Sequence, residues 1–115
     1  MDALIEEASK KAAVAWLDGQ AVWCLWHGGT LYVVHGPGEQ PAPALALSTV
    51  DVTVRGDHGG AIVTWSAEVD RVGPGTPEWD EVVPLLAAKR LNGSASPARW
   101  AGGATVSRLS PRTAG

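Results

Sequence analysis

The sequence has little cysteine, no excess of positive charge and no long hydrophobic run. A single cysteine, Cys24, excludes an internal disulfide. Nine Lys and Arg against twelve Asp and Glu give a formal charge of −3, and the basic residues are scattered. This balance argues against nucleic-acid binding, which needs a clustered basic surface. No apolar run reaches the about 18 residues of a membrane-spanning helix, which excludes membrane insertion.

Phenylalanine is absent and tyrosine occurs once, whereas tryptophan occurs six times. We therefore expect the indoles to supply much of the buried aromatic area. The N-terminus, with Glu6 and Glu7, lacks the basic and then apolar layout of a signal peptide, which predicts a cytoplasmic protein. A chain of 115 residues has room for one core. We predict a single domain over residues 1–115, with a core at about 2–110 and a polar tail at 111–115.

The first third of the chain predicts a helix followed by a three-stranded meander. Asp2 is a suitable N-cap, and acidic and basic residues at i, i+4 spacing support a helix over residues 2–12. Asp18-Gly19 is the pair that a type I′ turn favours, and Gly28-Gly29 predicts a second tight turn. The strands joined by these turns are expected at residues 13–17, 20–27 and 30–35.

The middle strand of this meander contains "AVWCLW", which is apolar at successive positions. A strand with one wet face alternates between apolar and polar residues, so this pattern predicts that both faces are covered. One face would line the core. A second subunit or a ligand would cover the other.

The rest of the chain predicts two alternating strands, a helix and a final strand. Strands are expected at 50–55 and 61–72, where Val or Trp alternates with polar residues. Thr76 and Pro77 begin a helix that ends before Asn92, with Pro84 kinking or breaking it. A last strand covers 104–109. The order of elements predicts a mainly β protein with helices (α+β), a six-stranded, strongly twisted barrel with the helices at its edges.

The loop after the third strand, "HGPGEQP", admits two interpretations. Glycines let backbone N–H groups converge on a phosphate, which favours a cofactor loop at Gly36 to Gly38. The same glycines are typical of a tight turn that needs positive φ. The loop contains Glu39 and neither Lys nor Arg, so its composition leaves both interpretations open.

The stretch "VWCLWHGGTLYVVHGPGEQPAPAL" and the later "PEWDEVVPLLAAKRL", with the element order above, resemble the FMN-binding split-barrel proteins. This is the pyridoxamine 5′-phosphate oxidase-like family, which includes deazaflavin-dependent reductases of actinobacteria, and the resemblance covers about residues 2 to 110. It implies a split-barrel homodimer with FMN or deazaflavin at the subunit interface, against the second and third strands. The cofactor-binding residues that it implies are Trp23, Leu25, Trp26, Gly36, Gly38 and Gln40.

The family usually grips the flavin phosphate with basic residues, and this chain has none at the corresponding positions. Gln20 stands where the second strand begins, and Glu39, Gln40 and Pro41 stand in the loop. Two hypotheses follow. In the first, the protein is a flavin- or deazaflavin-dependent oxidoreductase whose cofactor carries the hydride transfer. In the second, it is a non-catalytic homodimer that has lost the phosphate clamp and binds another small ligand or none.

Other chemistry-bearing residues favour structural roles. Cys24 has no neighbouring cation in the sequence to lower its pKa, which favours a buried structural thiol. The three histidines lack metal-ligand spacing, and His27 and His35 border turns, so they are expected to be solvent-exposed. Glu78, Asp80 and Glu81 suit the N-terminal end of a helix dipole. We predict no catalytic residue and no metal ligand.

Overall fold

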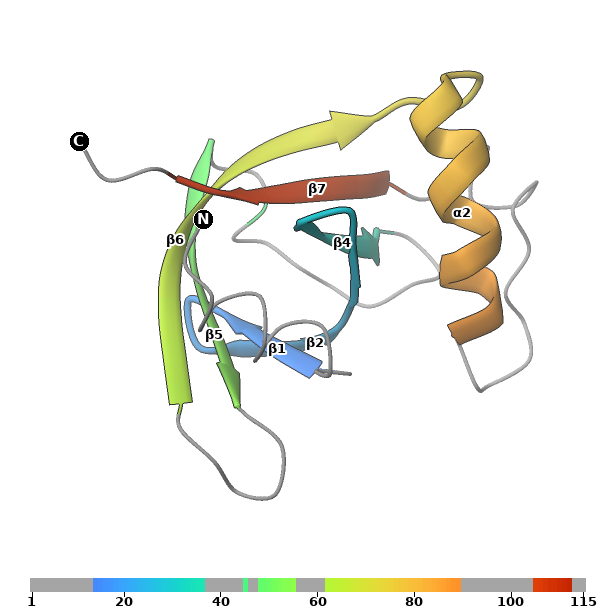
Figure 1. The fold of residues 1–115 in the computed structure, drawn as a ribbon. Helices are drawn as coiled ribbons and strands as arrows, with labels where there is room; N and C mark the ends of the chain where they lie inside the picture. The colour runs from blue at the N-terminus through green and yellow to red at the C-terminus, as the bar shows by residue number, and fades with distance from the viewer. Residues whose placement is uncertain (1–13, 37–44, 46–47, 56–61, 90–104, 113–115) are drawn as a thin grey trace.

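The structure is a computed structural model that describes residues 14–36, 45, 48–55, 62–89 and 105–112 (Figure 1). The predicted helix at residues 2–12 lies outside these ranges. The described elements are the strands β1 (Val14–Leu17), β2 (Gln20–Trp23), β3 (Leu25–His27), β4 (Thr30–His35), β5 (Thr49–Arg55), β6 (Ile62–Val72) and β7 (Thr105–Pro111), and the helix α2 (Pro77–Lys89).

The strands form one antiparallel sheet in the order β2-β1-β5-β6-β7-β4-β3. The two strands at the ends of this order, β2 and β3, follow each other in the chain and are joined by Cys24. The sheet therefore curls into a nearly closed barrel, with α2 to one side of it (Figure 1).

The prediction of six strands is wrong, because the described residues form seven. The expected strand at 20–27 is interrupted at Cys24: β2 pairs with β1, and β3 pairs with β4. This segment passes from one end of the sheet to the other. Since the two halves hydrogen-bond to different neighbours, the pairing is interrupted where the chain changes partner.

The predicted turns are confirmed by the backbone angles. Asp18 and Gly19 have φ values of 47° and 91°, and Gly28 and Gly29 have 62° and 85°. Positive φ at both central residues is the requirement of a type I′ turn, which matches the twist of the flanking strands. The alternation expected in the two long strands is also confirmed, since Val52, Val54, Trp65 and Ala67 are buried.

Two hydrophobic clusters lie on the two faces of the sheet. The inner cluster fills the barrel and includes Val22, Cys24 and Trp65, with Trp26 packed against it. The outer cluster lies between the sheet and α2, and Trp23 and Leu25 pack against it. Successive residues of "VWCLW" therefore alternate between the clusters, as a strand requires.

This arrangement corrects the expectation for "AVWCLW". One face lines the core as predicted, but the other packs against α2 of the same chain, and Ala21 is exposed. A helix that supplies an apolar stripe accounts for the second apolar face without a partner. Trp23 and Leu25 are only partly buried in this position.

Helix α2 begins as predicted. The backbone N–H of Trp79 donates to the Thr76 hydroxyl at 3.2 Å, which identifies Thr76 as the N-cap. The helix runs through Pro84 to Lys89, and its expected continuation to Asn92 lies outside the described residues. Its buried side, which covers the outer face of the sheet, consists of Trp79, Val82, Val83 and Leu86.

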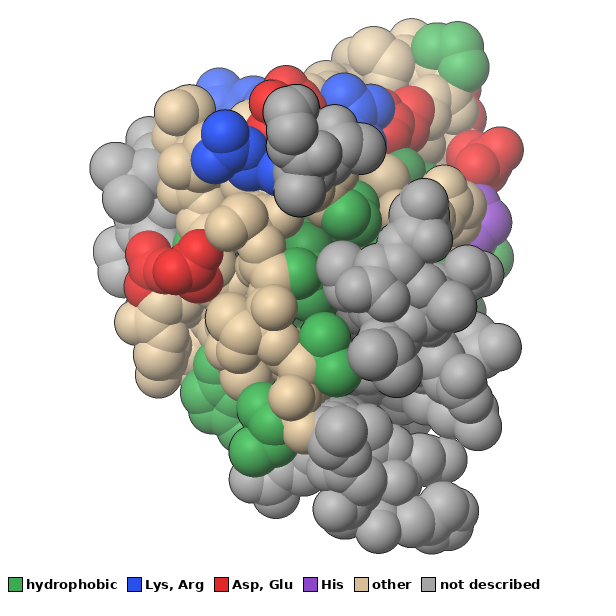
Figure 2. All heavy atoms as spheres, turned by 60° about the vertical axis from the view of Figure 1, so that its left-hand side comes forward, with side chains coloured by type: hydrophobic (Ala, Val, Ile, Leu, Met, Phe, Trp, Pro, Cys, Tyr) green, Lys and Arg blue, Asp and Glu red, His purple; other side chains and the backbone are tan. Residues whose placement is uncertain are grey.

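The surface carries charges of both signs. On the face shown in Figure 2, basic and acidic side chains lie close together along the upper edge. Neither sign dominates this part of the surface. Within the part of the chain that the structure describes, no helix is long and apolar enough to cross a membrane.

Candidate functional site

The inner face of the sheet becomes polar where three neighbouring strands reach one end of the barrel. Along β4, the buried Leu31 and Val33 are followed on the same face by His35. In the strand pairing, His35 lies opposite Thr105 of β7, and Ser107 lies opposite both Val33 and Arg71 of β6. These pairs share one face because directly opposed residues in a sheet point the same way.

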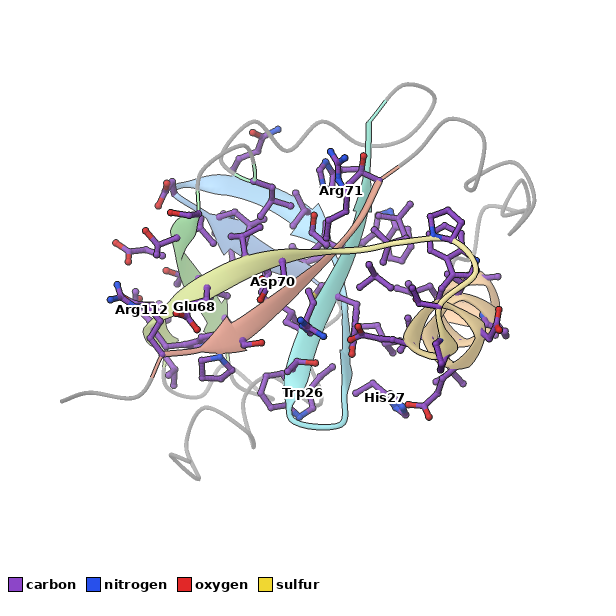
Figure 3. The ribbon with its side chains drawn as sticks, turned by 90° about the horizontal axis from the view of Figure 1, so that it is seen from above. Trp26, His27, Glu68, Asp70, Arg71 and Arg112 are labelled. Atoms are coloured by element: carbon purple, nitrogen blue, oxygen red, sulfur yellow. The ribbon has the colours of Figure 1, made fainter. Side chains whose placement is uncertain are left out.

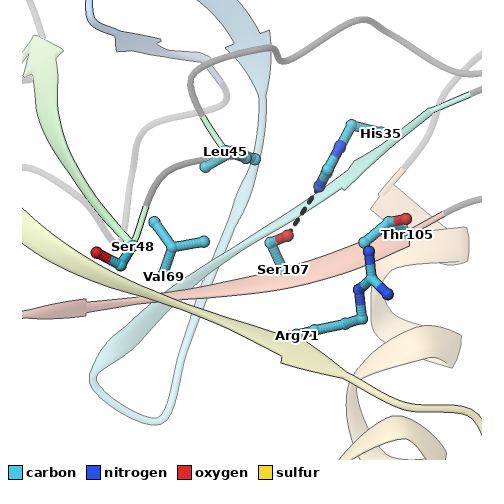
Figure 4. A pocket seen from close by; sticks show the side chains of 7 residues that line it. All are labelled: His35, Leu45, Ser48, Val69, Arg71, Thr105 and Ser107. Atoms are coloured by element: carbon cyan, nitrogen blue, oxygen red, sulfur yellow. Dashed lines mark hydrogen bonds between the residues drawn. The ribbon is translucent and has the colours of Figure 1, made fainter.

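A cavity of about 290 Å³ lies at this end, and we refer to it as the mouth pocket (Figure 4). Its volume is near the lower end of the range of small-molecule sites, about 300 to 1,000 Å³. Side chains from three strands and from the segment before β5 line it. They are His35, Leu45, Ser48, Val69, Arg71, Thr105 and Ser107.

His35 is held within the mouth pocket by Ser107. The Nε2 atom of His35 lies 2.8 Å from the Ser107 hydroxyl oxygen, and Ser107 is only 3% exposed. Burial lowers the pKa of His35 below its usual value, and the positive charge of Arg71 lowers this pKa further. The imidazole is therefore neutral at neutral pH, with one nitrogen able to donate and the other able to accept.

Arg71 supplies the positive charge of the mouth pocket. Within the described ranges, no carboxylate forms an ion pair with it, whereas Arg108 pairs with both Glu78 and Asp70. The guanidinium therefore has donors available for a carboxylate or phosphate group. Arg112, at the far end of β7, lies well away from Arg71 in the view from above (Figure 3).

The opposite face of the same strands carries a second polar cluster. The Glu78 carboxylate of α2 accepts hydrogen bonds from the Tyr32 hydroxyl and the Arg108 guanidinium, both at 2.7 Å. Burial raises the pKa of Tyr32, and the Glu78 carboxylate adds to this effect. These contacts attach α2 to β4 and β7, so we assign this cluster a structural role.

A second carboxylate of α2 holds the turn between β3 and β4. His27 Nε2 lies 2.9 Å from Glu81. Glu78 and Asp80 occupy the first turn of α2 as expected from the helix dipole. The sequence did not reveal that Glu78 and Glu81 also reach across to the sheet.

The cofactor-binding residues expected from the resemblance do not lie together on one face. Trp23 and Leu25 face α2, whereas Trp26 faces the barrel interior and makes an edge-to-face contact with Trp65, with ring centroids 6.1 Å apart. Gly36 has a φ of 115° and directly follows His35 of the mouth pocket. The two remaining expected residues, Gly38 and Gln40, lie outside the described part of the chain.

The residues of the mouth pocket were not predicted from the sequence. The expectation that His35 is a solvent-exposed turn residue is wrong, because this side chain is partly buried against Ser107. Period-2 alternation was the available signal: His35 continues the face of Val33, and Arg71 continues the face of Val69. The pairing of Ser107 with Arg71 had no signal in the sequence, because it depends on the register of β6 and β7.

The remaining candidates give no further site. Cys24 is buried, as expected, and forms no disulfide. Among the described residues, no three His, Cys, Asp or Glu side chains are grouped as ligands of a metal ion would be.

Comparison with known proteins gives the fold. No family model and no curated protein matches the chain. Among solved structures, the crystal structure of HutZ, the heme storage protein from Vibrio cholerae, is similar with a TM-score of 0.69 at 15% sequence identity. The match covers 96% of this chain and 89% of that chain. The chain shares its split-barrel fold with HutZ over nearly its whole length.

Proposed function

We propose that this protein is a small-molecule-binding split barrel whose ligand places an anionic group in the mouth pocket. The observation that carries the proposal is Arg71, which no described carboxylate neutralises, beside His35 and the buried Ser107. Arg71 lines the pocket and is exposed to solvent, so its guanidinium is accessible to a ligand that enters from water. The anionic group of such a ligand would pair with it.

The volume and lining of the mouth pocket restrict the ligand. About 290 Å³ holds a small organic anion or the charged end of a larger molecule. Ser48, Thr105 and Ser107 carry hydroxyl groups around the hollow, while Leu45 and Val69 form its apolar wall. This combination suits a carboxylate or phosphate carried on an apolar body, because the polar groups fix orientation and the apolar wall adds contact area.

The similarity to HutZ supports a binding role. HutZ is described as a heme storage protein, and heme is an apolar ring that carries two carboxylates. Heme is therefore the first ligand to test here. In this role the protein needs no catalytic acid or base.

A flavin- or deazaflavin-dependent oxidoreductase is the second candidate, because Arg71 supplies a cation that the loop "HGPGEQP" lacks. It lies in the mouth pocket with His35, the residue directly before Gly36. The negative charge of a phosphate bound there would be balanced by Arg71 of β6 and not by a residue of the loop. The flavin would then supply the hydride chemistry, and the chain would position it.

We further propose that the protein is a homodimer. Trp23, Leu25 and Trp26 are all partly exposed in the single chain, although each belongs to an apolar run. A second copy packed against the outer side of Trp23 and Leu25 would bury the apolar surface that α2 leaves exposed there.

Titration of the tryptophan fluorescence with heme, FMN and the deazaflavin cofactor tests the binding proposal. Arg71→Gln should weaken binding of the accepted ligand about tenfold or more, since a hydrogen bond to a charged group contributes about 1.5 to 3 kcal/mol. Arg112→Gln is the matched control and should leave the affinity unchanged, because Arg112 lies outside the mouth pocket. Equal affinities for wild type and Arg71→Gln would exclude the mouth pocket as the site. Reduction of a bound flavin by a nicotinamide nucleotide would favour the second candidate.

A further inference from the structure

We infer that His35 makes the mouth pocket a pH-dependent anion site, in which protonation of the imidazole adds a second positive charge beside Arg71 and strengthens binding of an oxyanion. The inference rests on the proposed function, because it concerns the same pocket. It adds to that site a group that regulates binding. It also gives the direction of the pH dependence, because the ligand is bound more tightly at acidic pH and released toward neutral pH.

The geometry places the side chains of His35 and Arg71 on opposite sides of one buried hydroxyl, that of Ser107. In β7, Ser107 pairs with Arg71 of β6 on one side and with Val33 of β4 on the other. His35, two residues beyond Val33, bonds to Ser107 across the strands at 2.8 Å. Figure 4 shows His35, Ser107 and Arg71 around the same hollow, so an oxyanion bound there would contact groups from all three strands.

The charged groups around His35 leave a protonated imidazole without an acidic partner in the described structure. From β6, Arg71 faces the pocket and is positive. From β7, Ser107 and Thr105 are neutral, as are Ser48 and the apolar Leu45 from the segment before β5. The carboxylate and guanidinium of the neighbouring pair Asp70 and Arg108 lie on the opposite face of the sheet. An external anion is therefore the group that would stabilise the charged His35.

Protonation also changes the hydrogen bonding of Ser107. When Nε2 of His35 carries no proton, the Ser107 hydroxyl donates its hydrogen to that nitrogen. In the imidazolium both ring nitrogens are donors, so the Ser107 oxygen must accept a hydrogen bond from Nε2. The hydroxyl hydrogen of Ser107 is then free to donate to a bound anion. A protonated His35 thus gives the hollow both an additional charge and an additional hydroxyl donor.

The acid–base properties of His35 agree with this role. Burial and then the Arg71 charge lower the pKa of His35, so the ring is neutral when no anion is bound at neutral pH. The negative charge of an anion beside Arg71 favours the protonated ring, so it raises the pKa of His35 and opposes both effects. By linkage, a ligand that binds the protonated form more tightly must raise the pKa of His35.

Sulfate is a suitable probe, because its charge stays constant between pH 5 and pH 8, unlike that of phosphate. Binding is measured by the sulfate-induced shifts of the histidine ring signals in NMR spectra at both pH values. A unit charge a few ångströms away in a partly exposed site should tighten sulfate binding on the order of tenfold at the lower pH. Sulfate should also raise the pKa of His35 in a pH titration of its ring signals.

Variants separate this inference from the proposed function. His35→Gln keeps a group able to hydrogen-bond to Ser107 but cannot titrate, so sulfate binding, followed by backbone amide signals, should lose its pH dependence. Arg71→Gln should weaken sulfate binding at both pH values. His27→Gln, a histidine outside the mouth pocket, is the control and should keep the wild-type dependence.

Two results would overturn the inference. If wild-type sulfate binding were the same at pH 5 and pH 8 but required Arg71, the mouth pocket would remain an anion site without a histidine switch. If sulfate caused no shift of the His35 signals even at pH 5, the switch would be excluded, and the ligand titrations of the proposed function would decide that proposal separately.

Discussion

The hydroxyl of Tyr32 donates a hydrogen bond of 2.7 Å to the carboxylate of Glu78, which lies 46 residues further along the chain. Arg108 donates to the other oxygen of this carboxylate. One side chain at the start of α2 is thereby fixed to two adjacent strands, β4 and β7. This contact sets the position of the helix over the outer face of the barrel.

Replacing Glu78 should loosen this attachment. Glu78→Gln removes the charge that Arg108 pairs with, and we expect a loss of about 1 to 2 kcal/mol in the free energy of unfolding, limited by the partial exposure of the pair. Urea denaturation followed by tryptophan fluorescence measures it. Glu81→Gln breaks the more exposed contact with His27 and should cost no more than about 0.5 kcal/mol. Equal losses in the two variants would contradict the role assigned to Glu78.

The N-cap of α2 should also contribute to stability. Thr76→Ala removes the hydroxyl that accepts the N–H of Trp79 and should cost about 1 kcal/mol. Thr76→Ser retains this hydroxyl and should restore most of the loss. Thermal unfolding of both variants provides the measurement. An alanine variant as stable as the serine variant would show that the cap is dispensable.

Stability should fall on acidification because of His35. Its pKa is lower in the folded protein than the usual 6.5, so below pH 6.5 the unfolded chain takes up a proton before the folded chain does. The contribution of His35 to the free energy of unfolding is therefore fully present above pH 6.5. It declines as the pH falls from 6.5 to the lower pKa of the folded state. Urea denaturation at pH 5 and pH 8 should show a smaller pH dependence for His35→Gln than for wild type. An identical dependence in the two proteins would contradict the assignment.

Light scattering combined with size-exclusion chromatography tests the proposed homodimer. We expect a mass near twice that of the 11.9 kDa chain at micromolar concentration. A strictly monomeric protein would mean that α2 alone covers the outer side of Trp23 and Leu25. Leu85, exposed on α2, would then be the place to look for another apolar contact.

Local sequence patterns were sufficient to predict much of the fold. The type I′ turn at Asp18-Gly19, the N-cap at Thr76 and the alternation in β6 each depend on residues close together in the chain, and each is confirmed. Such features follow from backbone sterics and side-chain spacing alone.

Features that depend on distant residues were not accessible from the sequence. The change of partner at Cys24 depends on closure of the barrel, and an unbroken apolar run gave no sign of it. The mouth pocket depends on the register between β4, β7 and β6, which brings Arg71 and His35 to Ser107. Arg71 was not expected at this site because it is carried by β6 and not by the loop that follows β4.

The passage of one segment from β2 through Cys24 to β3 also limits the aggregation hazard of the sheet. Unpaired strand edges act as templates for the strands of other molecules. Here the two edge strands have only four and three residues and are consecutive in the chain. The long strands β5 and β6 have neighbours on both sides. In the described sheet, the strands left for edge-to-edge pairing with another molecule are therefore the short β2 and β3.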